Sequence, residues 1–285
     1  MNNTWDALLS ILPSRLRSQV DRLGKTDAQN LRLRLDTPPE LNCATGTHWL
    51  EGNISREDLD FCVNTASRYS PWASATVSKG YITAKGGHRL GICGEAVIKN
   101  GVLCGMRNIS SVCIRIARDV RNISGDLDRV KGSLLILGAP GWGKTTLLRD
   151  LIRKKSGRGT HICVLDQREE LFPFGISRGC RIDVLSGCPK GEGMDMLLRT
   201  MAPDIIAMDE ITAAEDCKAL EQAAWCGVDL IATAHASSLQ DLCSRPVYYP
   251  LVRQNLFDHI VILRKDKSWT LERSKTWTAN GSARY

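Results

Sequence analysis

The run from residue 134 to residue 148, LLILGAPGWGKTTLL, constrains the fold of this 285-residue chain more than any other part of it. It has the GxxxxGK[ST] spacing of a Walker A loop, and it lies between an apolar stretch that predicts a buried strand and a stretch that predicts a helix. In such loops the glycines let successive backbone N–H groups turn toward one point, where the helix dipole also favours an anion. We therefore expect a phosphate-binding loop in an α/β domain.

The side chains of this loop have separate expected roles. Lys144 should reach the outer phosphates of a bound nucleotide, and the hydroxyl of Thr145 should serve Mg²⁺. The other residues expected to hold the nucleotide are Gly138, Ala139, Pro140, Gly141, Trp142, Gly143 and Thr146.

A pair of acidic residues, Asp209 and Glu210, directly follows the apolar run of residues 205–208. In a parallel sheet this Walker B arrangement brings Asp209 and Glu210 to the strand edge near the phosphate loop. Asp209 would hold Mg²⁺, through water, and Glu210 would orient and deprotonate the attacking water.

Three more polar residues come at or just after expected strand ends. Asp166 closes the strand expected over residues 161–166, and Glu169 follows it closely. Both would support the phosphate site or position water, although a surface loop of mixed charge has the same pattern. His235 follows the strand expected over 229–234, where it would sense the γ-phosphate or serve a structural role. With Lys144 and Glu210, these residues form the expected catalytic group.

The length and the charge distribution predict two domains. Residues 1–125 carry a net charge of +5, residues 126–263 one of −2, and the last 22 residues one of +4. We expect residues 1–125 to form a smaller α+β domain for assembly or partner contacts, and residues 126–285 to form the α/β nucleotide-binding core. The basic flanks suggest an acidic partner, such as nucleic acid, lipid or protein, or simply solvated charge.

The N-terminal region has both helical and strand patterns. Residues 5–23 space their apolar side chains as a helix interrupted by Pro13, and residues 31–35 alternate Leu and Arg as a half-buried strand does. Residues 90–98 predict a strand, Asn100-Gly101 a two-residue hairpin turn, and residues 112–116 another strand.

The core alternates strands and helices, as a parallel sheet requires. The expected helices are 144–155, 194–201 and 214–225; the expected strands are 134–137, 161–166, 204–209, 229–234, 259–264 and 269–272, with a loop-rich stretch from 167 to 189.

The chain has eleven cysteines, and no two of them have CxxC spacing, so neither a zinc ribbon nor a disulfide framework is indicated. The N-terminus lacks the pattern of a signal peptide, and no run of 18 apolar residues occurs. We therefore expect a cytoplasmic protein whose contact with a membrane, if it has one, is peripheral or through a partner.

The chain resembles the stage III sporulation protein AA family, cytoplasmic ATPases of endospore-forming bacteria, over nearly its whole length. The matching blocks are Gly80–Thr83, Gly86–Arg89, Ile109–Ser111, Ile114–Arg118, the Walker A loop, Asp183–Leu185, Gly187–Lys190, Asp209–Ile211 and Ala232–His235. That family is in turn similar to secretion and pilus motor ATPases, whose Walker A, aspartate, Walker B and histidine boxes correspond to the four sites above.

The resemblance implies a RecA-like P-loop ATPase core that uses ATP and Mg²⁺. It also implies a homo-oligomer, a hexamer by analogy with the motors, acting in the channel that the mother cell builds toward the forespore. Partners would be other stage III sporulation proteins, including an integral membrane protein that keeps the ATPase at the membrane. Arginines before the core would complete a neighbouring subunit's site, with Arg107, Arg115 and Arg118 as candidates. The chain departs from the motors in having Ile211-Thr212-Ala213-Ala214 after Walker B, where they usually carry an arginine.

Three other functions remain open from the sequence. The basic N-terminal domain is compatible with a RecA-like ATPase driven by nucleic acid, for which Arg32, Arg34 and Arg89 would supply charge, and Tyr69, Trp72 and Tyr81 the stacking rings. Dense aromatic interleaving is missing, so nucleic acid is not the leading partner. A small-molecule kinase would need an acceptor pocket and a lid, and neither is evident. A scaffold that binds nucleotide without turnover is the third alternative.

Overall fold

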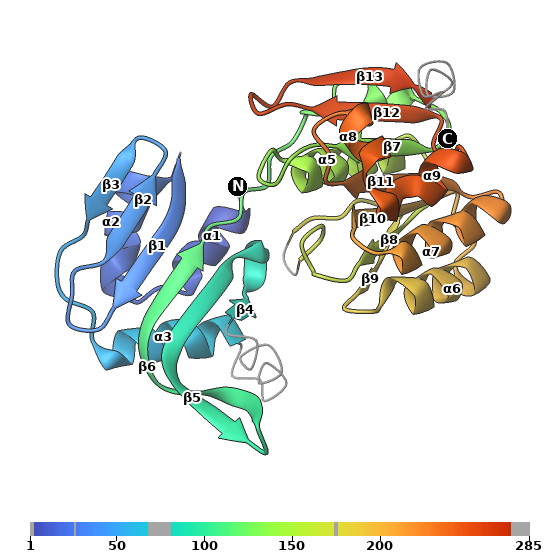
Figure 1. The fold of residues 1–285 in the computed structure, drawn as a ribbon. Coiled ribbons are helices and arrows are strands. Elements are labelled where there is room, and N and C mark those ends of the chain that lie inside the picture. Colours follow the sequence, from blue (N-terminus) through green and yellow to red (C-terminus); the bar gives the residue numbers. More distant parts are fainter. Residues whose placement is uncertain (1–2, 26, 68–80, 174–175, 275–285) are drawn as a thin grey trace. The chain divides into compact units, whose positions relative to one another are not determined.

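The computed structural model describes residues 3–25, 27–67, 81–173 and 176–274 (Figure 1). The chain divides into two compact units, one of Met1–Asp119 with Pro173–Ile176 and one of Val120–Phe172 with Ser177–Tyr285. The boundary expected from the sequence, at residue 125, lies a few residues beyond this division. Tyr69, Trp72 and Gly80, which entered the sequence arguments, lie outside the described residues.

The N-terminal unit is built on a six-stranded antiparallel sheet in the order β3-β2-β1-β6-β5-β4. Its strands are β1 (Ala28–Arg34), β2 (Glu40–Cys43), β3 (Gly46–Trp49), β4 (Tyr81–Thr83), β5 (Arg89–Lys99) and β6 (Val102–Arg115), and its helices are α1 (Asn3–Ser10), α2 (Ser14–Gly24), α3 (Arg56–Ser67) and the 3₁₀ turn η2 (Lys85–Gly87). Leu31 and Leu33 are fully buried while Arg32 between them is exposed, so the predicted alternation is confirmed. The helix expected over residues 5–23 is also confirmed, as α1 and α2 on either side of Pro13.

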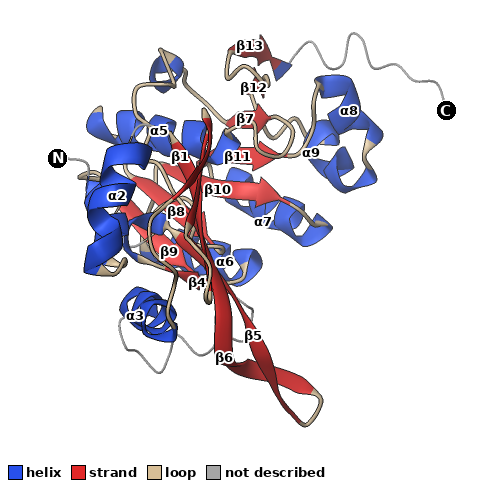
Figure 2. Cartoon of the chain, turned by 90° about the vertical axis from the view of Figure 1, so that its left-hand side faces the viewer, coloured by secondary structure: helices blue, strands red, loops and turns tan. Residues whose placement is uncertain are grey.

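Strands β5 and β6 form a long hairpin that runs beyond the rest of the sheet (Figure 2). Asn100 and Gly101 both have positive φ, at 51° and 75°, as a type I′ turn requires, so the predicted turn is confirmed. The strand expected over residues 112–116 is the last part of one long strand, β6, which begins directly after the turn. Its irregularity near Asn108, whose φ is 47°, lies opposite Gly94, where the register shifts.

The second unit contains a seven-stranded sheet in the order β13-β12-β7-β11-β10-β8-β9. Its strands are β7 (Leu134–Leu137), β8 (Ile162–Asp166), β9 (Ile182–Ser186), β10 (Ile205–Ile211), β11 (Asp229–Ala234), β12 (His259–Leu263) and β13 (Trp269–Arg273). All neighbours pair in parallel except β12 and β13. Every residue of β7 and β8 is buried, as expected for strands covered on both faces.

Helices cover both faces of this sheet. Helix α5 packs against one face, and α6 to α9 lie on the other (Figure 2). Side chains of α6 to α9 join a single apolar core with the sheet. The helices are α5 (Lys144–Gly157), α6 (Lys190–Thr200), α7 (Ala214–Trp225), α8 (Leu239–Ser244) and α9 (Tyr249–Arg253), with 3₁₀ turns η3 (Leu127–Arg129) and η4 (Pro246–Tyr248). The expected core strands and helices are all present. Two expectations were wrong in detail, because the stretch expected to be loop contains β9, and α6 begins at Lys190, four residues earlier than expected.

The strand order decides which residues meet at the carboxyl edge of the sheet. β11 and β10 lie between β7 and β8, although β8 follows β7 along the chain. The loops after β7, β11, β10 and β8 therefore come together there, and ligands of open parallel sheets bind at this edge. Among the described residues, no helix has both the length and the apolar character needed to cross a membrane.

Candidate functional site

The loop between β7 and α5 has the backbone of a phosphate-binding turn. Gly141 and Gly143 have φ values of 75° and 102°, a region in which a side chain would be strained. The ammonium of Lys144, the first residue of α5, turns back over the loop and donates to the carbonyl oxygens of Gly138 (2.7 Å) and Ala139 (3.2 Å). The ammonium therefore lies at the centre of the turn, where the phosphates of a nucleotide would bind.

Lys144 is buried, with 6 % of its surface exposed. Burial lowers the pKa of its ammonium, while the negative charges of Asp209 and Glu210 oppose that shift. A third anion, such as a phosphate, would favour the charged lysine further.

Thr145 and Asp209 form the expected metal-binding pair. The Thr145 hydroxyl donates to one carboxylate oxygen of Asp209 at 2.7 Å, and the Thr233 hydroxyl donates to the other, also at 2.7 Å. Hydroxyl and carboxylate oxygens that meet beside a phosphate loop are the ligands that Mg²⁺ prefers. The donor set therefore fits the metal expected from the sequence.

His235 links the phosphate loop to the second acidic residue. Its Nδ1 lies 2.9 Å from the Lys144 ammonium, and its Nε2 lies 2.8 Å from Glu210 Oε1. The sequence predicted that these three residues would meet, and the structure brings them into one hydrogen-bonded chain.

Glu210 is held in an unusual backbone conformation. Its φ is 55°, and the pairing of β10 with β11 shifts register between Met208 and Ile211. Its backbone N–H donates to the Thr233 hydroxyl at 2.8 Å, and its carboxylate accepts from Arg168 at 2.5 Å. Non-glycine residues persist in this region only where their surroundings impose it, and such residues cluster at functional sites.

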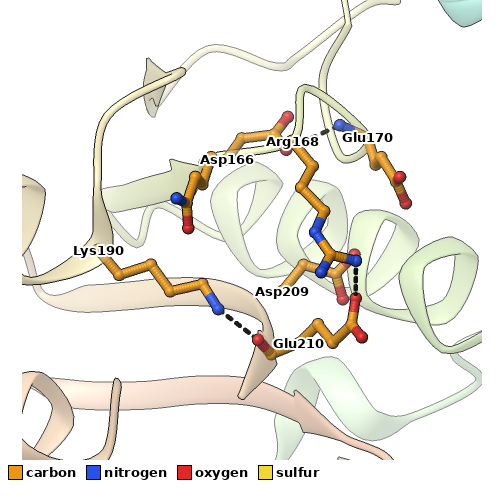
Figure 3. A pocket seen from close by; sticks show the side chains of 7 residues that line it. Asp166, Arg168, Glu170, Lys190, Asp209 and Glu210 are labelled. Atoms are coloured by element: carbon orange, nitrogen blue, oxygen red, sulfur yellow. Dashed lines mark hydrogen bonds and ion pairs between the residues drawn. The ribbon is translucent and has the colours of Figure 1, made fainter. Parts of the chain in front are cut away.

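A pocket opens beside these groups (Figure 3). It is lined by Asp166, Gln167, Arg168, Glu170, Lys190, Asp209 and Glu210. In Figure 3 the side chain of Arg168 points to the carboxylate of Glu210, while that of Lys190 points to the Glu210 backbone. Both expected Walker B acids therefore line one wall of a polar pocket.

Asp166 ends β8 and lines the pocket, as expected, whereas Glu169 does not line it. The Asp166 carboxylate accepts the backbone N–H groups of Glu170 (2.8 Å), Leu171 (3.0 Å) and Phe172 (2.8 Å), so it shapes its own loop. Burial raises the pKa of Asp166, and these hydrogen bonds oppose the rise. Glu169 is exposed, and the pocket is lined by its neighbour Glu170 instead.

Lys190 and Asp216 form a buried ion pair next to Glu210. The Lys190 ammonium donates to Asp216 at 2.9 Å and also to the Glu210 backbone carbonyl. Burial by itself would raise the pKa of Asp216, but the Thr212 N–H and the Lys190 ammonium outweigh burial and lower it.

Sequence reasoning assigned no role to several residues of the site. Thr233 was detectable as a hydroxyl in an otherwise apolar buried strand, and Lys190 only as part of a family block. Lys267, in the turn between β12 and β13, donates to the Gly141 carbonyl at 2.9 Å, and no pattern in the sequence indicated that contact.

Comparison with known proteins identifies relatives over almost the full chain. The model of the family described as "Sporulation stage III, protein AA" matches residues 3–272. Stage III sporulation protein AA of Bacillus subtilis is 34% identical over 279 residues, which cover 91% of each chain. Protein ycf45 of Porphyra purpurea is 27% identical over 87% of this chain and 43% of its own.

Two solved structures show the fold. The Legionella pneumophila ATPase DotB has a TM-score of 0.59 at 17% identity and covers 92% of this chain and 80% of its own. The pilus retraction motor PilT, solved with bound ADP, has a TM-score of 0.62 at 15% identity, with 90% and 80% covered. The chain has the RecA-like P-loop ATPase fold of these proteins.

Proposed function

The chain belongs to the sporulation stage III, protein AA family, and on that basis we propose that it hydrolyses ATP as a secretion-type motor. It would work as an oligomer in the channel between mother cell and forespore. Two fold relatives, an ATPase and a pilus retraction motor with bound ADP, support a nucleotide-driven mechanical role.

One observation carries the proposal: hydrogen bonds join the phosphate loop to the Walker B acids, Asp209 and Glu210. Lys144, His235 and Glu210 form one chain of contacts, and Thr145 with Asp209 forms another beside it. A protein that only bound nucleotide would need the phosphate loop, but it would not need a carboxylate linked to that loop through a histidine.

This geometry suggests how ATP is cleaved. Lys144 would turn from the loop carbonyls to the phosphate oxygens when ATP binds. Glu210 would accept a proton from the water that attacks the γ-phosphorus, as the bond to the β–γ bridging oxygen breaks and ADP leaves. Arg168 and His235 contact different oxygens of the Glu210 carboxylate, and each oxygen keeps a further lone pair that could accept the proton of water. Asp166 would keep the Arg168 loop in shape, and Glu169 has no direct role in this scheme.

Thr145 and Asp209 would hold Mg²⁺ next to the phosphates. The metal ion would supply charge neutralisation of the phosphate oxygens. The residues themselves fix its place, because Thr233 orients Asp209 while the Asp209 carboxylate orients Thr145.

We extend the proposal to location and partners. The protein would be cytoplasmic in the mother cell, and it would associate peripherally with the membrane through an integral stage III partner. A homo-oligomer, a hexamer by analogy with the motors, would place arginines of one subunit near the ATP of the next.

The test is ATP turnover with Mg²⁺, measured together with nucleotide binding by Trp142 fluorescence. Lys144→Ala should weaken ATP binding by about 10- to 100-fold, because it removes a charge-assisted contact. Glu210→Gln should keep ATP bound and lower turnover by at least about 100-fold. Glu215→Gln, a matched change at an exposed position of α7, should leave both unchanged.

Two results would contradict the proposal. If Glu210→Gln turned over ATP at the rate of the unmodified protein, Glu210 would not be the base. If ATP bound but no hydrolysis occurred at any protein concentration or with membrane partners present, a nucleotide-gated scaffold would be the better description.

Nucleic acid as the driving partner is less well supported. Arg34 is paired with Glu40 at 2.6 Å, and Arg89 lies over the ring of Tyr81 at 4.8 Å, so these groups are already engaged within the N-terminal unit. Stimulation of turnover by single strands, with a steep salt dependence, would favour this alternative.

A further inference from the structure

The conformation of Glu210 requires support from outside its own strand. Its positive φ costs free energy in any residue with a side chain. The pairing of β10 with β8 ends at Met208, so the regular ladder does not extend to Glu210. Other groups must therefore hold this backbone in place.

Two side chains hold the backbone of Glu210 from opposite ends of the residue. Thr233 accepts the Glu210 N–H at 2.8 Å, and the Lys190 ammonium donates to the Glu210 carbonyl. Together they fix both polar backbone groups of one strained residue. The direction of the Glu210 side chain, toward His235, follows from this backbone.

Lys190 is itself rigidly placed. It is the first residue of α6, directly after Pro189, and only 8 % of its surface is exposed. Its ammonium is shared between Glu210 and Asp216, and Asp216 in turn accepts the Thr212 N–H (2.8 Å) and hydroxyl (3.1 Å) at the start of α7. The Lys190 ammonium thereby links α6, the start of α7 and the end of β10.

We propose that Lys190 is a positioning residue, which holds the Glu210 backbone in the conformation that directs its carboxylate toward His235 and the attacking water. This inference rests on the proposed role of Glu210 in ATP hydrolysis. A lysine that merely neutralised Asp216 would not need to reach the carbonyl of the strained residue.

The chain offers a matched control in Lys155. This lysine is equally buried, at 6 % exposed, and its ammonium also donates to a backbone carbonyl, that of Val130. It is not among the pocket residues. Lys155→Met should lower the stability of the protein as Lys190→Met does, but it should leave the Glu210 backbone unchanged.

The experiment compares kcat, KM and thermal stability of Lys190→Met, Lys190→Arg and Lys155→Met in the full chain. Lys190→Met should lower kcat by about 10- to 100-fold, because small misplacements of a catalytic group have effects of this size, and KM should change by less than about twofold. Lys190→Arg keeps a donor and should recover most of kcat. Lys155→Met should leave kcat unchanged at temperatures where it is folded.

A second readout does not depend on hydrolysis. Amide hydrogen exchange in residues 205–213 should be faster in Lys190→Met than in Lys155→Met, because the Glu210 backbone loses its clamp. If Lys190→Met does not fold, Asp216→Asn tests the same contact, since it loosens the ammonium without removing it.

The outcomes separate the inference from the proposed function. Unchanged exchange, or a fall in kcat no larger than that of Lys155→Met, would overturn the role of Lys190 while leaving Glu210 as the base. If the protein never hydrolyses ATP but Lys190→Met still exchanges faster, the proposed function is overturned. The role of Lys190 in holding the Glu210 backbone is then retained.

Discussion

At the scale of single residues, the two neighbours of His235 determine where its proton lies. The Lys144 ammonium can only donate, so Nδ1 must accept, and Nε2 must carry the hydrogen that Glu210 accepts. A doubly protonated ring would place an N–H against the lysine.

This tautomer predicts different effects for two substitutions of His235. Glutamine can place an amide N–H where Nε2 lies, whereas asparagine reaches only the position of Nδ1. We expect His235→Gln to retain more turnover than His235→Asn, with losses of about 10-fold and about 100-fold. Steady-state turnover at saturating ATP measures this difference. Equal losses in the two variants would show that contact with Glu210 is not what matters.

A buried histidine in the N-terminal unit predicts acid sensitivity. His88 is fully buried; its Nε2 contacts the Thr4 carbonyl at 2.8 Å, and its Nδ1 accepts the Ala117 N–H at 3.1 Å. Burial lowers the pKa of His88 below its ordinary value, while the bond to Thr4 opposes the shift. The unfolded chain therefore takes up a proton as the pH falls through about 6.5, and the folded unit does not.

The stability that neutral His88 contributes should be complete above that pH and decline below it, toward the folded pKa. Denaturant unfolding of the N-terminal unit between pH 8 and pH 5 measures the effect. His88→Gln keeps a donor for Thr4 but loses the acceptor for the Ala117 N–H, so the variant should be less stable at pH 8 by about 1–3 kcal/mol. Because glutamine does not titrate, the stability of the variant should also depend less on pH. Parallel profiles for the two proteins would contradict the assignment.

At the scale of secondary structure elements, the strength of the local pattern decided what could be predicted. β7, β8 and β11 were predictable because a strand buried on both faces needs an uninterrupted apolar run. β9 has only Ile182 buried, so its sequence lacks the apolar run that predicts a buried strand. Helix α3 buries a cysteine and an alanine along with Leu59, and such small residues gave too weak a periodic signal.

The same reasoning applies to the site. Lys144, Thr145, Asp209, Glu210 and His235 were predictable because strand ends and loop spacing place them together. Arg168, Lys190 and Thr233 were not assigned roles, because their contacts depend on the irregular backbone at Glu210. No spacing rule reports that irregularity.

The β5–β6 hairpin gives a prediction about an element. A Cβ at position 94 would lie 2.7 Å from the Arg107 carbonyl oxygen, where the opposite strand bulges. Gly94→Ala should therefore destabilise the hairpin by about 1–3 kcal/mol, since backbone must move to make room. At Gly105, on the same hairpin, a Cβ would have nothing within 4 Å, so Gly105→Ala should stay within about 0.5 kcal/mol. Amide exchange along residues 95–107 measures both, and equal exchange in the two variants would be inconsistent with close packing at Gly94.

At the scale of the whole molecule, the excess positive charge of the N-terminal unit offers arginines that could contact ATP in a neighbouring subunit of the proposed oligomer. The chain carries a net charge of +7, and residues 1–125 contribute +5 of it. Arg115 is exposed in the N-terminal unit, whereas Arg107 is paired with Glu95 at 3.0 Å, and Arg118 donates to the Ala28 carbonyl. Arg115 is thus the best candidate to reach the ATP of a neighbouring subunit.

We expect turnover per subunit to rise with protein concentration, because each site would be completed by a second copy. Arg115→Ala should lower turnover of the assembled protein by about 1,000-fold or more, the lower part of the range for arginine fingers, without changing ATP affinity of the dilute chain. Arg22→Ala, an exposed arginine on α2, serves as the control. Sedimentation with turnover on the same samples provides the measurement, and unchanged turnover of assembled Arg115→Ala would exclude this arginine.

The insertion of β11 and β10 between β7 and β8 also bears on how the protein is made. A ribosome releases the phosphate loop well before it releases β11, yet β7 has no neighbour on that side until β11 arrives. Early parts of the chain must therefore wait for late ones, and nucleotide would find no complete site on a nascent or truncated chain. ATP would bind only the finished sheet, so the nucleotide of the proposed ATPase would also stabilise the folded protein by mass action.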